Sequence, residues 1–167
     1  MRGATHTFAG VTIAVLMFAP APPLVLAGAA IAGGIGALLP DLDHPQSTIS
    51  RRVWLAGATL RLVVSHRGAL HSLLAMAAAL LLAATVPGDW SQIALSAAVG
   101  YCSHIFLDAL TISGVPLLWP KQQRYRLLRL RTGGFGEMLF AWGLLFVLVY
   151  VFRNQIGDLL DQIAARL

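Results

Sequence analysis

Five apolar runs take up most of the sequence and limit the folds open to it. They cover about residues 5–19, 24–39, 68–86, 90–112 and 137–152. Most of them approach the roughly 20 residues that a helix needs to cross the hydrocarbon core of a bilayer. Only 11% of the residues are charged and 57% are hydrophobic, whereas a soluble domain has about 25% charged residues. We therefore expect an all-α, polytopic membrane helix bundle, with about five transmembrane helices and interfacial segments, in one domain over residues 1–167.

The first two runs are separated only by a proline-rich turn at residues 20–23, which predicts a transmembrane hairpin. The first run follows Arg2 and could instead be a signal peptide, but a second apolar run comes at once and no separate cleavage site stands between them. The second run is rich in glycine and alanine, which let helix backbones approach closely in lipid. The helix over 24–39 is therefore expected to be central in the bundle.

Basic residues gather in the N-terminus and in the loops over 40–65 and 113–136, while the turns over 20–23 and 87–89 have none. By the positive-inside rule these basic segments face the cytoplasm. We expect a multi-pass protein of the cell inner (plasma) membrane. The formal charge of +5 does not indicate nucleic acid binding, because the basic residues lie between apolar runs rather than on a soluble surface. The segment over 121–131 could be a hairpin or an interfacial segment, and residues 154–167 an amphipathic tail.

A histidine and an aspartate lie four residues apart in the run over 90–112, at His104 and Asp108. Residues at this spacing share one face of a helix, about one turn from each other. This is also a spacing of metal ligands. Cys102 falls nearly opposite His104 and is interpreted as a packed or lipid-facing thiol. Considered alone, such a pair is more often a structural hydrogen bond between imidazole and carboxylate than a metal site.

The expected topology brings all five histidines and four of the seven acidic residues to one membrane face. These residues are His6, Asp41, Asp43, His44, His66, His71, His104, Asp108 and Glu137. His66 is expected before the third helix and His71 one turn inside it, because the two are five residues apart. Ionisable groups at membrane depth are costly and usually functional, so the clustering predicts a metal site. Imidazole with carboxylate suits zinc, manganese or iron, and so many candidates indicate two or three ions.

Metal ions in such a cluster would activate a water against a phosphoryl or carbonyl centre, so no nucleophilic side chain is required. The sequence accordingly contains neither a GxSxG elbow nor a P-loop. Arg67, and either Arg51 or Arg52, could grip a phosphate bidentately, with anionic lipid binding as an equal alternative. The candidate catalytic residues are Asp43, Glu137 and Arg67.

Several short motifs follow one another over about residues 5–140. They are Thr5-His6 with Gly10, LPDLDHPQS, HRGALHS, GYCSHIFLDALTISG followed by WP, and TGGFGE. In these motifs the chain resembles the YdjM-like family of inner-membrane-associated, metal-dependent hydrolases, itself distantly similar to zinc-dependent phospholipase C and the single-strand-specific zinc nucleases. The resemblance implies a phosphoesterase. It also implies a ligand set made of His6, Asp41, His66, His71, His104 and Asp108.

Three functions are consistent with these features. The first is a hydrolase that uses divalent metal, zinc above all with manganese as an alternative, to cleave a lipid phosphoester at the cytoplasmic membrane face. The second is a non-enzymatic metal-binding protein, or an ion or proton transit protein, in which the same residues form a transit site. The third is a scaffold whose basic loops bind an acidic protein, although the sequence identifies no particular protein partner.

Overall fold

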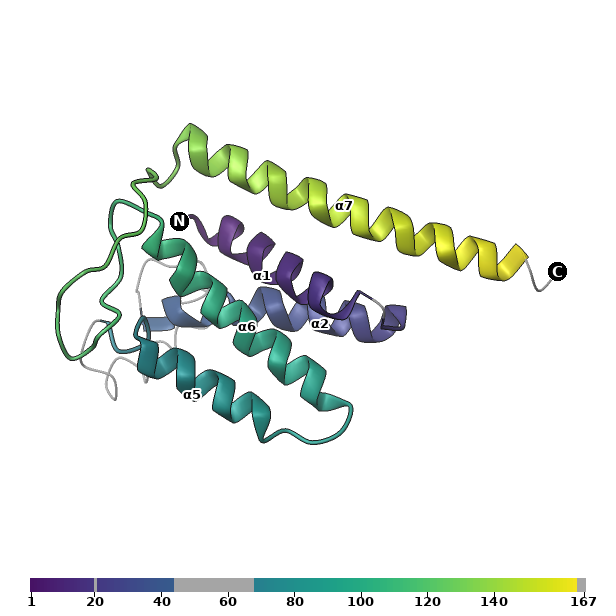
Figure 1. Ribbon diagram of the computed structural model, residues 1–167, viewed down its shortest axis with the longest axis horizontal. Helices are drawn as coiled ribbons and strands as arrows, with labels where there is room; N and C mark the ends of the chain where they lie inside the picture. The colour runs from purple at the N-terminus through teal and green to yellow at the C-terminus, as the bar shows by residue number, and fades with distance from the viewer. Residues whose placement is uncertain (20, 44–67, 165–167) are drawn as a thin grey trace.

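The computed structural model describes residues 1–19, 21–43 and 68–164, and the described part of the chain is helical (Figure 1). Its elements are α1 (Gly3–Phe18), α2 (Pro23–Gly36), the 3-10 helix η1 (Leu39–Asp43), α5 (Leu73–Ala84), α6 (Trp90–Ala109) and α7 (Phe135–Ala164). In these ranges the only β-type pairings are two isolated bridges. The all-α expectation is therefore confirmed, and each predicted apolar run overlaps one of the α-helices.

Glycines bring α1, α2 and α6 into direct backbone contact. A Cβ on Gly33 of α2 would lie 2.5 Å from the carbonyl oxygen of Gly10 on α1. A Cβ on Gly100 of α6 would lie 2.1 Å from the carbonyl oxygen of Gly33. Since neither position has room for a side chain, Gly33 lets α2 touch α1 and Gly100 lets α6 touch α2. The expectation that this small-residue helix is central agrees with these contacts.

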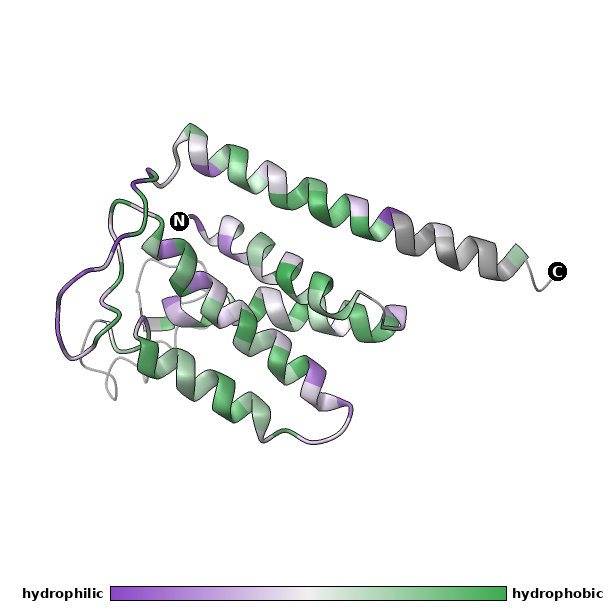
Figure 2. Cartoon of the chain, viewed as in Figure 1, coloured by the Kyte–Doolittle hydropathy of each residue, from purple (hydrophilic) through white to green (hydrophobic). Residues whose placement is uncertain are grey.

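The other two helices cover the outside of this trio. One apolar cluster joins α6 to α5 and contains Tyr101, Ile105, Ala109 and Val115, with Ala75, Met76 and Ala79 packed against it. A second joins α7 to α1 and α2 and contains Val15, Leu26 and Leu148. Large apolar side chains on the outer surface of α7 are exposed, among them Trp142 and Phe146, and green colouring runs along α7 and α5 in Figure 2.

Helix length separates α7 from the other apolar helices. Among the described residues, only the segment Phe135–Arg153 is long and apolar enough to cross a membrane. Helices α1, α2 and α5 are apolar but have 16, 14 and 12 residues. At about 1.5 Å per residue, α5 spans roughly 18 Å, which is less than the roughly 30 Å of a bilayer core. The expected five crossings therefore stay a prediction.

One end of the bundle collects the segments that contain the candidate residues. The chain's N-terminus, the end of α2, the start of α5, the end of α6 and the start of α7 all lie on the same side in Figure 1. The stretch between α6 and α7 closes this end with main-chain hydrogen bonds between Val115 and Tyr125, whose donor–acceptor distances are 2.8 and 3.0 Å. This stretch forms isolated bridges rather than a hairpin.

Candidate metal centre

His104 lies in the second-last turn of α6 and is fully buried, with 0% exposure. Its Nδ1 lies 2.7 Å from the main-chain carbonyl oxygen of Ala37, just past the end of α2. Because a carbonyl can only accept, this nitrogen donates and holds the ring proton. A neutral His104 therefore presents the lone pair of Nε2, and a hydrogen bond of this kind is the usual support of a metal-ligating histidine.

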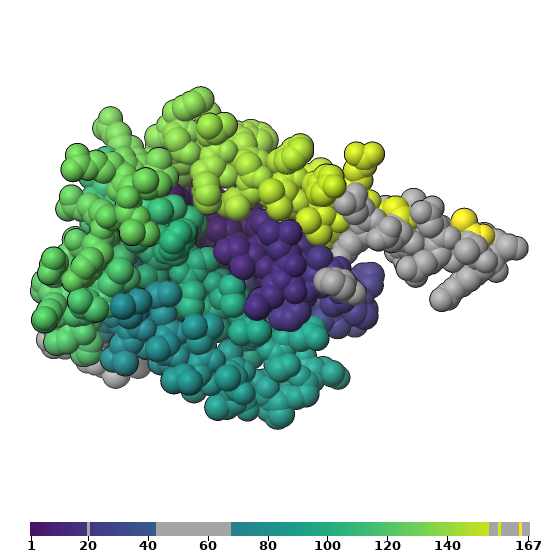
Figure 3. All heavy atoms as spheres, in the orientation of Figure 1, coloured from purple at the N-terminus to yellow at the C-terminus, as the bar shows by residue number. Residues whose placement is uncertain are grey.

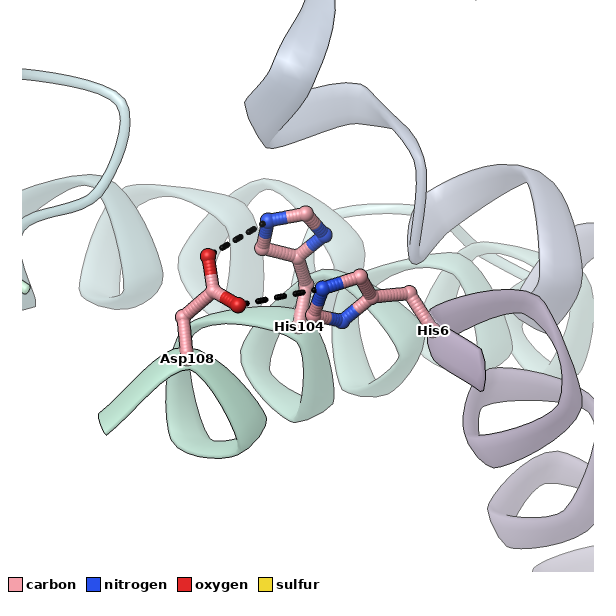
Figure 4. A group of neighbouring side chains, drawn as sticks. All are labelled: His6, His104 and Asp108. Carbon is pink, nitrogen blue, oxygen red and sulfur yellow. Dashed lines mark ion pairs between the residues drawn. The ribbon is translucent and has the colours of Figure 1, made fainter. Parts of the chain in front are cut away.

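His6 lies in the first turn of α1 and stacks on His104, with ring centroids 3.7 Å apart and ring planes at 16° (Figure 4). The Nε2 atoms of both rings face the same carboxylate, that of Asp108. Asp108 Oδ1 lies 3.1 Å from His6 Nε2, and its Oδ2 lies 3.5 Å from His104 Nε2. Asp108 Oδ1 also accepts from the α-amino group of Met1. The spacing of four residues thus brings His104 and Asp108 together on one face, as predicted.

A second group shares His104. Asp41 Oδ1 lies 3.7 Å from His104 Nε2 and 3.8 Å from His71 Nε2. The rings of His71 and His104 meet nearly edge to face, with centroids 5.3 Å apart. The structure thus brings together five of the six predicted metal ligands, from α1, η1, the turn before α5, and α6.

Local structure explains how Asp41 and His71 reach this place. Pro40 is buried in η1, and Asp41 follows it with its amide donating to the carbonyl of Leu38. His71 lies in the turn that precedes α5, rather than one turn inside the helix as expected, because Ser72 caps the helix by accepting from Ala75 N at 3.2 Å. The hydroxyl of Tyr101 donates to the carbonyl of Leu70 and fixes this turn against α6.

The glycine contacts lie one turn away from the site on each helix. Gly10 comes four residues after His6, Gly33 four before Ala37 and Gly100 four before His104. The closest approach of the three helices therefore sets the separation of the two stacked imidazoles and of the Ala37 carbonyl. The role of Ala37 is not predictable from its residue type, because an alanine carbonyl leaves no signal in the sequence; only the repeated spacing of four could have indicated it.

The described residues fit a divalent metal. His6, His104 and Asp108 offer ligand atoms within 4.8 Å of one another, as do Asp41, His71 and His104. Ligand atoms held at about 2.0–2.2 Å in a tetrahedron are roughly 3.3–3.6 Å apart, and the four imidazole–carboxylate distances run from 3.1 to 3.8 Å. Within the described ranges, buried His6 Nδ1 and His104 Nε2 have no hydrogen-bond partner. Of these two atoms, His104 Nε2 faces the carboxylates of Asp41 and Asp108. A lone pair that faces carboxylates needs a cation between them, which a metal ion would supply.

Glu137 lies outside both ligand groups. It is 2% exposed and accepts three hydrogen bonds, from the amide of Arg2 at 2.6 Å, the hydroxyl of Thr5 at 2.7 Å and the amide of Gly133 at 2.6 Å. These contacts tie the start of α7 to the start of α1, next to His6. Its predicted catalytic role stays a prediction, and the observed contacts are those of an anchor.

The remaining candidates are placed differently. His44, Arg51, Arg52, His66 and Arg67 lie outside the described residues. Asp43 is the last residue of η1, two positions after Asp41. Cys102 is a free, half-buried thiol and belongs to neither ligand group of the described part of the chain. Its interpretation as a packed thiol is consistent with this position.

Helical fold and site together define a class, an all-α protein with histidine and aspartate groups that could bind a metal ion. A family model described as YdjM inner membrane protein matches residues 1–160. The chain belongs to this family. Membership of a membrane protein family implies association with the membrane.

Two relatives illustrate the family. The chain is 36% identical over 156 residues to the uncharacterized protein YvsG of Bacillus subtilis (strain 168), covering 91% of this chain and 94% of YvsG. It is 45% identical over 98 residues to the inner membrane protein YdjM of Escherichia coli (strain K12), covering 54% of this chain and 48% of that protein. The match thus spans about half the length of the latter relative. No solved structure matches the chain.

Proposed function

We propose that this protein is a multi-pass inner-membrane hydrolase that uses a divalent metal, zinc above all, to cleave a phosphoester of a membrane lipid. The observation that carries the proposal is the pair of ligand groups that share His104. Its Nδ1 donates to Ala37, which leaves Nε2 to face the carboxylates of Asp41 and Asp108. A structural hydrogen-bond network would have a proton between these atoms, whereas a metal site has a cation there.

The buried setting supports a metal rather than a proton as that cation. His6 and His104 stack with centroids 3.7 Å apart, and two imidazolium rings in such a stack repel each other. Two neutral imidazoles between two carboxylates are the ligand set that zinc and manganese accept. A bound ion of this kind polarises a phosphoryl oxygen and activates water.

The chain's own residues then have distinct tasks. Asp41 and Asp108 supply negative charge on either side of His104, and their carboxylate oxygens would bind the same ion as its Nε2. Arg67 is proposed to grip the phosphate of the substrate, because a guanidinium pairs bidentately with phosphate oxygens. Asp43 and Glu137 are kept as the other candidate catalytic residues, Asp43 because it follows Asp41 by two positions in η1.

The substrate class follows from the proposed place of the site. The ligands gather where α1 begins and α6 ends, at the end of the bundle that also contains the N-terminus and the basic segment over 113–136. With the helices crossing the membrane, this end would lie at headgroup depth on the cytoplasmic side. A headgroup phosphate could then reach the ligands while the acyl or prenyl chain stays in lipid.

The packing below the site favours a hydrolase over ion or proton transit. Helices α1, α2 and α6 touch through Gly10, Gly33 and Gly100 directly beyond the imidazoles. The buried hydroxyls of Thr12 and Ser96 donate to carbonyls of their own helices, at 2.7 Å each. Within the described helices these hydroxyls therefore bond to the backbone and do not form a polar path. An ion or proton transit site needs such a path.

The test combines metal content with turnover in the full chain purified in mild detergent. Elemental analysis should give at least about one zinc per chain, and phospholipids or polyprenyl phosphates should release phosphate or phosphoester only while metal is present. Asp108→Asn and His104→Ala should lose metal and turnover, because each removes a ligand. Cys102→Ser is the matched control on α6 and should retain both. Full metal content without turnover on any phosphoester, together with zinc flux in liposomes, would replace the hydrolase with the transit site.

A further inference from the structure

A strongly basic surface lies beside the candidate metal centre. Between Asp108 and Glu137 the sequence has no acidic residue. The segment over 113–134, named here the basic loop, contains five cationic side chains, all exposed: Lys121, Arg124, Arg126, Arg129 and Arg131. Figure 2 shows its hydrophilic colouring against the apolar helices. None of the five forms an ion pair with any acidic group in the described part of the chain.

Main-chain hydrogen bonds fix the basic loop to the end of α6 that contains Asp108. The amide of Leu127 donates to the carbonyl of Ala109 at 2.7 Å, and the amide of Leu130 donates to that of Leu110 at 3.0 Å. The Arg124 guanidinium donates to the carbonyls of Ser113 and Gly114, at 3.2 Å each. The loop is therefore attached to the two residues that follow Asp108, and its cations lie on a defined surface beside the site rather than on a freely moving tail.

Exposed leucines lie among and next to these cations. Leu127 and Leu128, between Arg126 and Arg129, are 63% and 53% exposed, and Leu118 is 44% exposed. Figure 3 shows the loop's atoms gathered on the surface at one end of the molecule, where α5 begins. A leucine pair held out between arginines suits the boundary between headgroups and acyl chains, where apolar side chains enter the lipid and guanidinium groups remain with the phosphates.

We propose that the basic loop binds the headgroups of anionic phospholipids and holds them beside the metal centre. The inference rests on the membrane placement in the proposed function, but not on hydrolysis. Several cations without an acidic neighbour attract an anionic leaflet, and guanidinium groups pair with phosphate oxygens at defined geometry. An occupant that offers acidic groups alone would pair with the cations but leave the flanking leucines in water, whereas lipid matches both features.

Binding can be measured without turnover. The full chain in neutral detergent, with chelator present, is titrated with dihexanoyl phosphatidylglycerol and with dihexanoyl phosphatidylcholine, both below their micelle concentrations. The anionic lipid should bind about tenfold more tightly than the zwitterionic lipid at low salt, and the preference should shrink in high salt. Arg126→Gln combined with Arg129→Gln should remove most of the preference for the anionic lipid. Arg153→Gln is the matched control, since Arg153 is exposed at the far end of the apolar segment of α7.

The outcomes separate lipid from other anions. Leu127→Ser combined with Leu128→Ser should weaken the binding of both lipids. Glycerol phosphate without acyl chains should bind at least about tenfold less tightly than the anionic lipid. Equal affinity for the two lipids in wild type, at low salt, would overturn the proposal without reference to any folding effect of a variant. Equal binding of glycerol phosphate, or tighter binding of a polyglutamate peptide, would assign the surface to a free phosphate or to an acidic protein instead. Loss of hydrolysis alone leaves these affinities unchanged, so the two proposals fail separately.

Discussion

The Nδ1–H group of His104 donates to the carbonyl oxygen of Ala37 across 2.7 Å and joins α6 to the end of α2. This bond selects the ring tautomer, so the lone pair of Nε2 faces Asp41 and Asp108. It also depends on how closely the two helices approach. One turn earlier, Gly100 and Gly33 are in backbone contact. The chemistry of the imidazole is thus coupled to a glycine contact that touches none of the ligands.

A larger residue at position 100 should therefore weaken the metal site, although Gly100 contacts none of the ligands. In Gly100→Ala the new Cβ would lie 2.1 Å from the carbonyl oxygen of Gly33, so α6 must move away from α2. We expect a loss of about 1–3 kcal/mol in the free energy of unfolding, typical of overpacking. Zinc affinity should fall as well, because the Ala37 carbonyl no longer supports His104. Thermal unfolding and equilibrium dialysis with zinc measure the two effects.

Gly143→Ala is the control for this prediction. Gly143 lies in α7, and a Cβ there would meet no atom within 4 Å, so the variant should match the wild type or be slightly more stable. If Gly100→Ala kept wild-type stability and zinc affinity, the close contact of α2 and α6 would not be what sets the geometry of His104.

Substituting individual histidines should reveal that the two ligand groups share His104. One imidazole nitrogen binds one ion, so Nε2 of His104 is essential to whichever group is filled. His104→Ala should remove most of the metal, while His6→Ala and His71→Ala each remove a ligand from one group only and should lower affinity less. Elemental analysis after dialysis against a series of zinc concentrations ranks the three variants by their zinc affinity.

The double variant His6→Ala with His71→Ala supplies the check, since among the ligands that the structure describes it leaves His104 with Asp41 and Asp108. It should be as metal-poor as His104→Ala. Equal metal content in the three single variants would mean that His104 is not shared. Retention of metal in all of them would assign the described residues to a hydrogen-bond network.

The sequence predicted the helices and the ligand cluster because both leave local signals. Apolar runs bounded by proline and glycine predict where helices occur, and His104 and Asp108 meet because their spacing equals one helical turn. The start of α5 was missed by five residues. Gly68 has a φ of +115°, and Ser72 caps the helix; together they delay it to Leu73 and leave His71 in a turn.

What the sequence could not indicate depends on main-chain groups and on packing. The support of His104 comes from a carbonyl at Ala37, and the anchor of the α1 start comes from Glu137 on a helix more than 130 residues away. The cluster of ionisable residues suggested that Glu137 faces the metal, since topology alone gives the end of a helix and not the direction of its side chain. Its three donors became visible only in three dimensions.

Glu137→Gln should therefore act mainly on stability. The carboxylate accepts from the amides of Arg2 and Gly133 and from the Thr5 hydroxyl. An amide side chain turns one NH₂ group toward these donors and leaves at least one buried N–H group unpaired, which costs about 1–3 kcal/mol. We expect a lower unfolding temperature in detergent and a moderate loss of zinc affinity, since Thr5 precedes His6.

Asp89→Asn is the matched control, because Asp89 is an exposed acid at the start of α6 whose side chain makes no capping hydrogen bond. It should change neither property. If Glu137→Gln abolished phosphoester cleavage while its unfolding temperature and metal content stayed at wild-type values, the residue would be catalytic rather than an anchor.

The orientation of the bundle can be tested with single cysteines in a Cys102→Ser background. Gln122 lies in the basic loop, at the end of the bundle that also contains the metal ligands, and it is exposed; Thr85 follows α5 and is exposed near the opposite end. If basic segments remain in the cytoplasm, Gln122→Cys should be protected from a membrane-impermeant maleimide in intact cells and labelled after lysis. Thr85→Cys should be labelled before lysis. The reverse pattern would move the metal centre to the outer leaflet, and protection of both sites in intact cells would mean that α5 and α6 do not cross, in agreement with the roughly 18 Å length of α5.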